Sequence, residues 1–570
     1  MTLNLNALLV KWSEERASHK AFIYLGHGDK TEAEVTFSEL YRQSSKIAHY
    51  LFEKHTSAST ILLLFNSPFE FIKAFFGCLL AGKIAIPMFP PRNRKKIDRL
   101  VRILQNANSS LILTSNKVKT KLFERNDLGI ELDFQVEEIE QALDTEFSGV
   151  FDPLGVPQNE VAMLQYTSGS AGVPKGVIVT HQNILANQSV IKESFGHSDQ
   201  TVFGTWLPFF HDMGLVGNIL QPFYLGITCV LFTPEGFVQK PIRWIKAISD
   251  FGVTTSGAPN FAYDLCTARI DDAQLSDIDL SSWSVAYNGA EPISPNTLDR
   301  FTKKFEKCGF KRSSFFPCYG MAETTLIATG GDYRKDPVVV TIDGSKLAVG
   351  EAVTFGVPTD GNSKQIVGCG KAWQDNHLKI VDPKNCTSLP DGHIGEIWMN
   401  GSSVTQGYWG KEKENHEVFQ ASLSNGANTS PIYYLRTGDL GFFKNDELYI
   451  LGRLKDLIII RGRNYYPQDI EWEAEKAHPS LKMHSNAAFS IEIDDREELI
   501  LVQEIRRSWI PKIDQGEVKK AIKAAITNEF EVNAYEIVLV TTFSIPKTSS
   551  NKIMRKKTRE LYLNQQLVQL

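Results

Sequence analysis

The sequence predicts an α/β protein with a large first part built from parallel strands and helices, a β-rich segment after it, and a smaller α+β region at the end. Two observations carry this prediction. Apolar, strand-like runs alternate with helix-like segments through the first half of the chain. After about residue 330, short strands separated by Gly, Pro and Asp become the dominant pattern.

The first elements follow the order strand, helix, strand. Residues 61–65 form an apolar run that predicts a buried strand, residues 69–80 have helical spacing, and residues 84–87 predict the next strand. Because this order is typical of a parallel sheet with crossover helices, we expect an α/β layer here. Further strand candidates are residues 177–180 and 229–232.

The β-rich segment runs from Val338 to Tyr449. A basic, turn-like stretch at 452–456 follows it, and a smaller α+β pattern continues to the C-terminus. We therefore expect the main domain boundary near Lys455, with one domain over residues 1–454 and a second over residues 455–570. No repeat of fixed period is visible.

Composition restricts the class of protein. The 570 residues are 42% apolar and 22% charged, which is ordinary for a soluble globular chain. The net charge is −5 and no basic stripe is visible, which argues against nucleic acid as the main partner. Seven scattered cysteines indicate reduced thiols. With no signal-peptide pattern and no uninterrupted apolar span, we expect a cytoplasmic protein without a transmembrane segment.

The most informative motif is the stretch from Tyr166 to Gly176, Tyr-Thr-Ser-Gly-Ser-Ala-Gly-Val-Pro-Lys-Gly. Glycines let backbone N–H groups approach an anion closely, hydroxyls donate further hydrogen bonds, and Lys175 supplies positive charge. The string is neither a Walker A loop nor a nucleophile elbow. It predicts a triphosphate-binding loop; the alternative is a polar surface turn between two strands.

Further motifs follow this loop in order along nearly the whole chain. Together they resemble the core motifs of the adenylate-forming superfamily, which contains acyl-CoA synthetases, luciferases and peptide-synthetase adenylation domains. The resemblance implies a large N-terminal domain, a small mobile C-terminal domain and an active site between them. The motifs are residues 206–215, 287–292, 318–324, 435–440, 452–456, 461–464 and 546–552.

The resemblance also implies roles for single residues in binding ATP and Mg²⁺. Tyr319 stacks on the adenine, Asp439 accepts both ribose hydroxyls, Arg453 reaches the ribose or phosphates, and Glu323 holds Mg²⁺. Alternatives are a packed aromatic at Tyr319, a turn-forming Asp439, and a Glu323 satisfied by backbone amides. The full ATP-binding set is Thr167, Ser168, Gly169, Ser170, Gly172, Lys175, Gly289, Ala290, Glu291, Pro292, Tyr319, Gly320, Met321, Ala322, Asp439 and Arg453.

Two residues are expected to take part in catalysis. By the resemblance, Lys552 bridges the attacking carboxylate and the α-phosphate, which offsets their repulsion. His211 lies near the substrate carboxylate in similar sequences, and Lys455 occupies their hinge position. The alternatives are a solvated surface lysine and a satisfied core histidine. The chain departs from its relatives at Ala171 and Asn551, and neither change argues for an inactive protein.

The substrate prediction rests on two segments. The aromatic and apolar stretch with Phe209, Phe210, Met213 and Gly214 suits a pocket for an alkyl chain, although the same residues fit an ordinary core. Residues 334–367 resemble the insertion of fatty acyl-AMP ligases, which pass their product to the phosphopantetheine thiol of an acyl carrier protein or a polyketide synthase carrier domain. The alternatives are a loop elaboration, a fatty acyl-CoA synthetase, and an inactive binding module.

Overall fold

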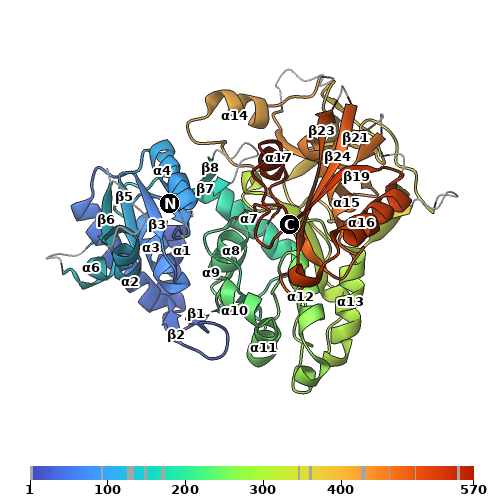
Figure 1. Cartoon of the computed structure of the whole chain (residues 1–570). Helices are drawn as coiled ribbons and strands as arrows, with labels where there is room; N and C mark the ends of the chain where they lie inside the picture. Colours follow the sequence, from blue (N-terminus) through green and yellow to red (C-terminus); the bar gives the residue numbers. More distant parts are fainter. Residues whose placement is uncertain are drawn as a thin grey trace.

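The computed structural model describes residues 4–91, 94–124, 134–146, 151–167, 174–344, 347–357, 363–424, 432–460, 463–493, 496–548 and 552–570. Figure 1 shows an N-terminal layer of sheet and helices on one side and the last third of the chain on the other, with the central helices between them. The α/β class predicted from the sequence is confirmed.

A six-stranded sheet forms the centre of the N-terminal layer, in the order β6-β5-β3-β4-β7-β8. All of its pairs are parallel except β7 with β8. Helix α3 (Pro68–Leu80) starts with a Ser67 cap and crosses from β3 to β4, as the apolar pattern predicts. The strands are β3 (Thr60–Leu64), β4 (Ile84–Met88), β5 (Leu111–Thr114), β6 (Gln135–Glu138), β7 (Val161–Thr167) and β8 (Lys175–Thr180).

A second sheet, in the order β2-β1-β10-β9, shares an apolar core with the first. The strand expected at residues 229–232 is β10 and belongs to this sheet, where it pairs in parallel with β1 and β9. Single β-bridges join β9 through Thr255 to the next sheet, β11-β12-β13. These strands are β1 (Lys20–Tyr24), β2 (Ala33–Thr36), β9 (Phe203–Thr205), β10 (Cys229–Leu231), β11 (Ala286–Asn288), β12 (Phe315–Gly320) and β13 (Ile327–Gly330).

Helices cover these sheets, and two large apolar cores fill the space between them. None of the helices in the described ranges combines the length and apolar character needed to cross a membrane. The helices of this part are α1 (Leu5–Glu15), α2 (Phe37–Lys54), α4 (Arg94–Ala107), α5 (Asn116–Lys119), α6 (Ile139–Asp144), α7 (His181–Ser194), α8 (Asp212–Leu215), α9 (Gln221–Leu225), α10 (Pro234–Gln239), α11 (Ile242–Phe251), α12 (Asn260–Arg269) and α13 (Pro295–Phe305).

The β-rich segment contains an antiparallel hairpin, β14 with β15, and a five-stranded sheet in the order β17-β16-β18-β19-β20. All pairs in this sheet are antiparallel, and helix α14 (Glu412–Phe419) lies between β18 and β19 in sequence. The strands are β14 (Val339–Asp343), β15 (Ser363–Val367), β16 (His377–Asp382), β17 (Thr387–Ser388), β18 (Gly395–Asn400), β19 (Leu435–Lys444) and β20 (Glu447–Arg453).

The last part of the chain has its own apolar core around Ile470, Leu501 and Ile522. It begins after a single helical turn at Leu454–Asp456 and contains the mixed sheet β23-β24-β25. Its elements are β21 (Ile458–Ile460), β22 (Arg463–Tyr465), α15 (Pro467–Ala474), β23 (Leu481–Ile493), β24 (Arg496–Ile505), α16 (Gln515–Phe530), β25 (Ala534–Val540) and α17 (Arg555–Leu563).

Candidate active site

Tyr319 and Asp439 form the first pair of the candidate site. Tyr319 lies on β12 and donates its hydroxyl to Oδ2 of Asp439 on β19, at 2.7 Å. Arg453 faces Asp439 across β19 and β20, and its Nε lies 3.2 Å from Oδ1. The carboxylate of Asp439 raises the pKa of Arg453. Each oxygen of Asp439 keeps lone-pair capacity beyond these two contacts, so the side chain can still accept hydroxyl groups.

The segment from Gly289 to Pro292 meets the segment from Tyr319 to Ala322 because β11 and β12 pair in parallel. A Cβ atom on Gly289 would lie 2.9 Å from the Cys318 carbonyl oxygen, and one on Gly320 would lie 1.7 Å from the Leu326 carbonyl oxygen. Both positions therefore require glycine. Ala290 has a φ of +68°, a conformation that non-glycine residues adopt mainly where surrounding structure enforces it.

Glu323 lies in a short helical turn, Ala322–Thr324, directly after this segment. Its Oε1 accepts a hydrogen bond from the Tyr408 hydroxyl at 2.8 Å, and its backbone carbonyl accepts two hydrogen bonds from Thr405. Burial raises the pKa of the Glu323 carboxyl, while the Tyr408 hydroxyl opposes this shift. A buried carboxylate with a raised pKa gains stability when a cation comes close.

Lys175 is the lysine of the predicted phosphate loop and lies within the residues that the structure describes. It begins β8 and pairs in register with Thr167, the last residue of β7. Its ammonium forms an ion pair with Glu414 on α14 and lies 4.7 Å from the centre of the Tyr408 ring. Ser168, Gly169, Ser170 and Gly172 of the same loop lie outside the described residues.

Residues 405–409 attach this group of side chains to β8. Ile178 donates its backbone N–H to the Gly407 carbonyl at 2.9 Å, and Trp409 donates to the Gly176 carbonyl at 2.7 Å. Tyr408 thus lies between Lys175 and Glu323, with its ring against one and its hydroxyl on the other. The predicted phosphate and metal residues are linked through one aromatic side chain.

His211 and the aromatic residues around it lie at the start of α8. His211 Nδ1 contacts the Asp212 carboxylate. The Phe209 ring centre is 4.9 Å from that of Phe71, and the Phe210 ring centre is 5.1 Å from that of Phe89.

Of the four residues predicted to line an acyl pocket, two belong to the apolar cores. Phe209 lies in the N-terminal core and Met213 packs in the core that contains Trp206. A side chain at Gly214 would meet the Pro208 carbonyl oxygen at 2.1 Å, so this position is glycine because of close backbone approach. Their role in holding an acyl chain stays a prediction.

Lys552 comes to this site from the other end of the chain. Its backbone is hydrogen-bonded to Thr548, which donates its N–H to the Lys552 carbonyl at 2.8 Å and accepts the Lys552 N–H on its hydroxyl at 3.0 Å. The side chain is exposed, yet the protein atoms around the ammonium lower the pKa of Lys552 by desolvation. Asp212 and Asp439 oppose that shift by their charge, which places the ammonium within electrostatic reach of both carboxylates.

Glu291 completes this electrostatic group. It accepts the backbone N–H of Phe261 at 2.5 Å, and desolvation raises its pKa to about 7. The charges of Lys552 and Lys547 act on Glu291 in the opposite direction. Glu291, Asp439 and Asp212 from the first 454 residues and Lys552 from the end of the chain therefore form one group.

Sequence reasoning missed three residues of this site. Asp212 stands next to His211 inside the motif at 206–215, and an acidic side chain in one motif is a signal for a charge partner of the lysine in another. Tyr408 and Glu414 lie in the β-rich region, 85 residues from Glu323 and 239 residues from Lys175. No local pattern marks either of them, because their role depends on contacts that only the folded chain creates.

Comparison with known proteins agrees with this geometry. The pattern of the family described as AMP-binding enzyme matches residues 9–409, and that of the Disco-interacting protein 2-like AMP domain matches residues 455–570. The chain is 39% identical over 562 residues to the medium-chain-fatty-acid–[acyl-carrier-protein] ligase JamA of Moorena producens, covering 98% of this chain and 94% of the relative.

A second relative and a solved structure are similar to this chain over nearly its whole length. The medium-chain-fatty-acid–[acyl-carrier-protein] ligase TtuA of Teredinibacter turnerae is 36% identical, over 96% of this chain and 91% of that protein. A structure from a study of fatty acyl-adenylate ligases of E. coli and L. pneumophila superposes with a TM-score of 0.87 at 31% identity, over 99% of this chain and 98% of the other. The chain belongs to the AMP-binding enzyme family.

Proposed function

We infer that this protein is a fatty acyl-AMP ligase. It uses ATP to convert a fatty acid into acyl-AMP with release of pyrophosphate, and it passes the acyl group to the phosphopantetheine thiol of an acyl carrier protein. The observation that carries this conclusion is the position of Lys552 in the electrostatic group of Asp212, Asp439 and Glu291. JamA and TtuA, which are ligases of medium-chain fatty acids with acyl carrier protein, support the substrate and the acceptor.

In the first half-reaction, a carboxylate oxygen attacks the α-phosphorus of ATP and the bond from that phosphorus to the β-phosphate bridge oxygen breaks. Lys552 lies between the two negative groups and stabilises the charge that develops as they approach. Lys175 binds the phosphates, Tyr319 meets the adenine, and Asp439 accepts the ribose hydroxyls. In the second half-reaction, the carrier thiol attacks the acyl carbonyl and AMP leaves.

Mg²⁺ fits the chemistry of Glu323. The described ranges contain no cluster of three or more His, Cys, Asp or Glu residues that could hold a metal by themselves. At the candidate site the protein therefore offers the single carboxylate of Glu323. Mg²⁺ is commonly held by one or two carboxylates together with substrate phosphates. Glu323 would hold the ion, which neutralises phosphate charge when it is bound, and Tyr408 keeps the Glu323 carboxylate oriented.

The region 334–367 contacts the chain beyond Lys455, which supports transfer to a carrier thiol. Lys364 on β15 forms an ion pair with Asp469 on α15, with Nζ 2.5 Å from Oδ2. Asn464 donates its side-chain N–H to the Leu347 carbonyl at 3.0 Å, and Tyr466 packs in an apolar core that this region shares with β19 and β20. These contacts oppose rotation of the last domain about Lys455. Our hypothesis is that ligation to free CoA requires this rotation.

The acceptor is tested by incubating the enzyme with a medium-chain fatty acid, ATP and either holo acyl carrier protein or CoA. We expect the acyl-carrier product from the native enzyme, whereas a dominant acyl-CoA product would favour a fatty acyl-CoA synthetase. Absence of pyrophosphate exchange with any fatty acid would favour an inactive binding module.

The double variant Lys364→Ala with Asp469→Asn weakens the contact between region 334–367 and the last domain. We expect this variant to form more acyl-CoA while it retains adenylate formation, and deletion within 334–367 should act in the same direction. Lys335→Ala is the matched control, because Lys335 is exposed in the same region and pairs locally with Asp332. A folded, adenylating variant without any gain of CoA product would contradict the restraint.

A further inference from the structure

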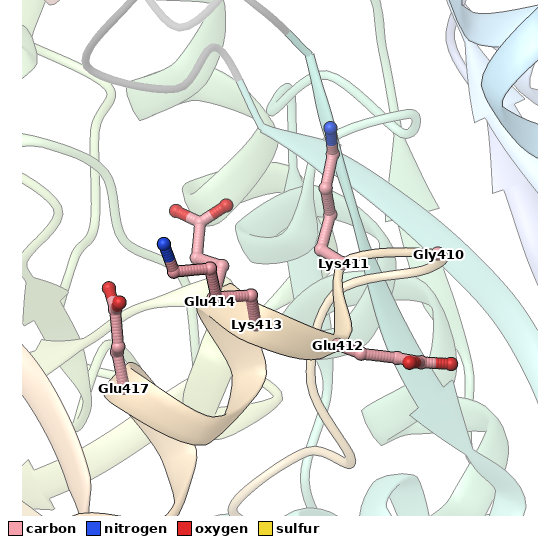
Figure 2. A pocket seen from close by; sticks show the side chains of 6 residues that line it. All are labelled: Gly410, Lys411, Glu412, Lys413, Glu414 and Glu417. Atoms are coloured by element: carbon pink, nitrogen blue, oxygen red, sulfur yellow. The ribbon is translucent and has the colours of Figure 1, made fainter.

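Helix α14 places a carboxylate on the cation that the proposed function needs for the phosphates. Glu414 forms an ion pair with Lys175, and both side chains are partly exposed, by 33% and 21%. Figure 2 shows Glu414 and Glu417 projecting from α14, with Lys413 next to Glu414 and Lys411 just before the helix. The Glu414 carboxylate therefore occupies a position next to Lys175 that a phosphate oxygen could take, with the same kind of ionic contact.

Lys175 does not depend on Glu414 for its position. Its backbone is fixed in β8 by pairing with Thr167, and Tyr408 supports its side chain through the ring contact. Asn415 holds the base of α14 separately, because it accepts the Tyr408 N–H at 2.7 Å and donates to the Tyr408 carbonyl at 2.9 Å. Loss of the Glu414 charge would therefore leave the lysine, the ring and the helix where they are.

We propose that Glu414 is a counter-ion that ATP displaces from Lys175, so that it weakens the binding of every phosphate ligand of this enzyme. This inference rests on the proposed function, since it needs Lys175 to meet the phosphates. If Lys175 leaves Glu414 for a phosphate, the ion pair is lost; if it keeps both partners, the Glu414 carboxylate repels the phosphate. In either case a neutral side chain at this position strengthens binding.

The same competition acts on the product side. Pyrophosphate carries the phosphate groups that Lys175 meets, and it must leave before the acyl group is transferred. Because Glu414 returns to Lys175 when pyrophosphate departs, the ion pair favours release of pyrophosphate. Glu414 thus acts through Lys175, and its charge balances the capture of ATP against the release of pyrophosphate.

The test compares the native enzyme with Glu414→Gln, whose amide oxygen still accepts a hydrogen bond from Lys175 but has no charge. Calorimetric titration with ATP and Mg²⁺, without any acid, should show a Kd about 5-fold lower for the variant, the ratio expected when a partly exposed ion pair is lost. Inhibition by pyrophosphate should strengthen by a similar ratio. Raising the salt concentration should narrow both differences, because salt screens exposed charges.

Three further variants make the test specific. Glu417→Gln removes an exposed charge from the same helix and should leave the Kd for ATP unchanged. In a Lys175→Gln background, Glu414→Gln should have no effect, because the partner of the carboxylate is gone. Glu414→Asp, which shortens the side chain, covers the case in which Glu414→Gln fails to fold, and it should lower the Kd by less.

An unchanged or weaker affinity of a folded Glu414→Gln for ATP would overturn the proposal, as would the same gain in Glu417→Gln or in the Lys175→Gln background. These results are separable from a failure of the proposed function. If no fatty acid supports pyrophosphate exchange but Glu414→Gln still binds ATP more tightly, the proposed function fails and the role of Glu414 stands.

Discussion

The two lysines of the candidate site are held in opposite ways. Lys175 begins a strand of the N-terminal sheet and already has an ionic partner in Glu414 and an aromatic support in Tyr408. Lys552 lies near the end of the chain, in the part whose apolar core contains Ile470 and Leu501, and among the described residues the charges of neighbouring groups act on its ammonium. Asp212 and Asp439 raise the pKa of Lys552 through their charge alone. Under the proposed function, Lys175 in the N-terminal part serves the binding of ATP and Lys552 near the end of the chain serves the chemical step.

The sharpest way to break this comparison is to remove Lys552. We expect Lys552→Ala to slow adenylate formation by about 10²- to 10³-fold, the size of effect seen when one stabiliser of a developing charge is lost, while the Kd for ATP stays nearly unchanged. Pyrophosphate exchange measures the first quantity and calorimetry the second. Lys556→Ala, an exposed position of α17, is the control. Near-normal exchange would remove Lys552 from the mechanism.

Lys175→Ala should give the complementary result. Loss of a charged hydrogen-bond donor to phosphate should raise the KM for ATP by about 10-fold, with a smaller change in kcat. Steady-state kinetics at saturating fatty acid separate the two constants. Lys413→Ala serves as the control, because Lys413 is exposed near the same end of α14. A loss confined to kcat would show that the division between the two lysines is wrong.

The smallest expected effect concerns pH. Desolvation lowers the pKa of Lys552 and the Asp212 carboxylate raises it, so kcat should fall as pH rises through this lowered pKa and the ammonium loses its proton. Asp212→Asn removes the opposing charge, and the alkaline limb of kcat should therefore move to lower pH, with little change near neutrality.

Lys552→Arg provides the reference for that profile. A guanidinium keeps its charge throughout this range, so any activity it supports should lack the alkaline limb. An alkaline limb that stays in place in Asp212→Asn, or that persists in Lys552→Arg, would show that a different group titrates.

Sequence reasoning was strongest where the information is local. The apolar run at 61–65, the helix at 69–80 and the run at 84–87 are predicted with bounds within one residue of β3, α3 and β4. Pairing was harder to predict. The runs at 177–180 and 229–232 are strands as expected. The first pairs antiparallel with β7 and the second belongs to another sheet, because an apolar run does not specify which strand pairs with it.

The site shows the same limit. Resemblance identified Tyr319, Asp439 and Lys552, each within a short motif, and the folded chain brings them into one group. It could not identify Glu414, since a glutamate in a polar helix looks like any solvated residue until Lys175 is seen beside it. Charge pairs between segments far apart in sequence are the part of a site that one sequence does not reveal.

The attachment of residues 405–409 to β8 has a mechanical consequence. Backbone hydrogen bonds at Ile178 and Trp409 bind the two segments edge to edge, so their amide protons should exchange with solvent as one cooperative unit. The stretch from Thr405 to Phe419 should then behave as one structural unit that can be exchanged between related enzymes. Exchanging it for the matching stretch of a relative should transplant nucleotide affinity while leaving the choice of acid with the host.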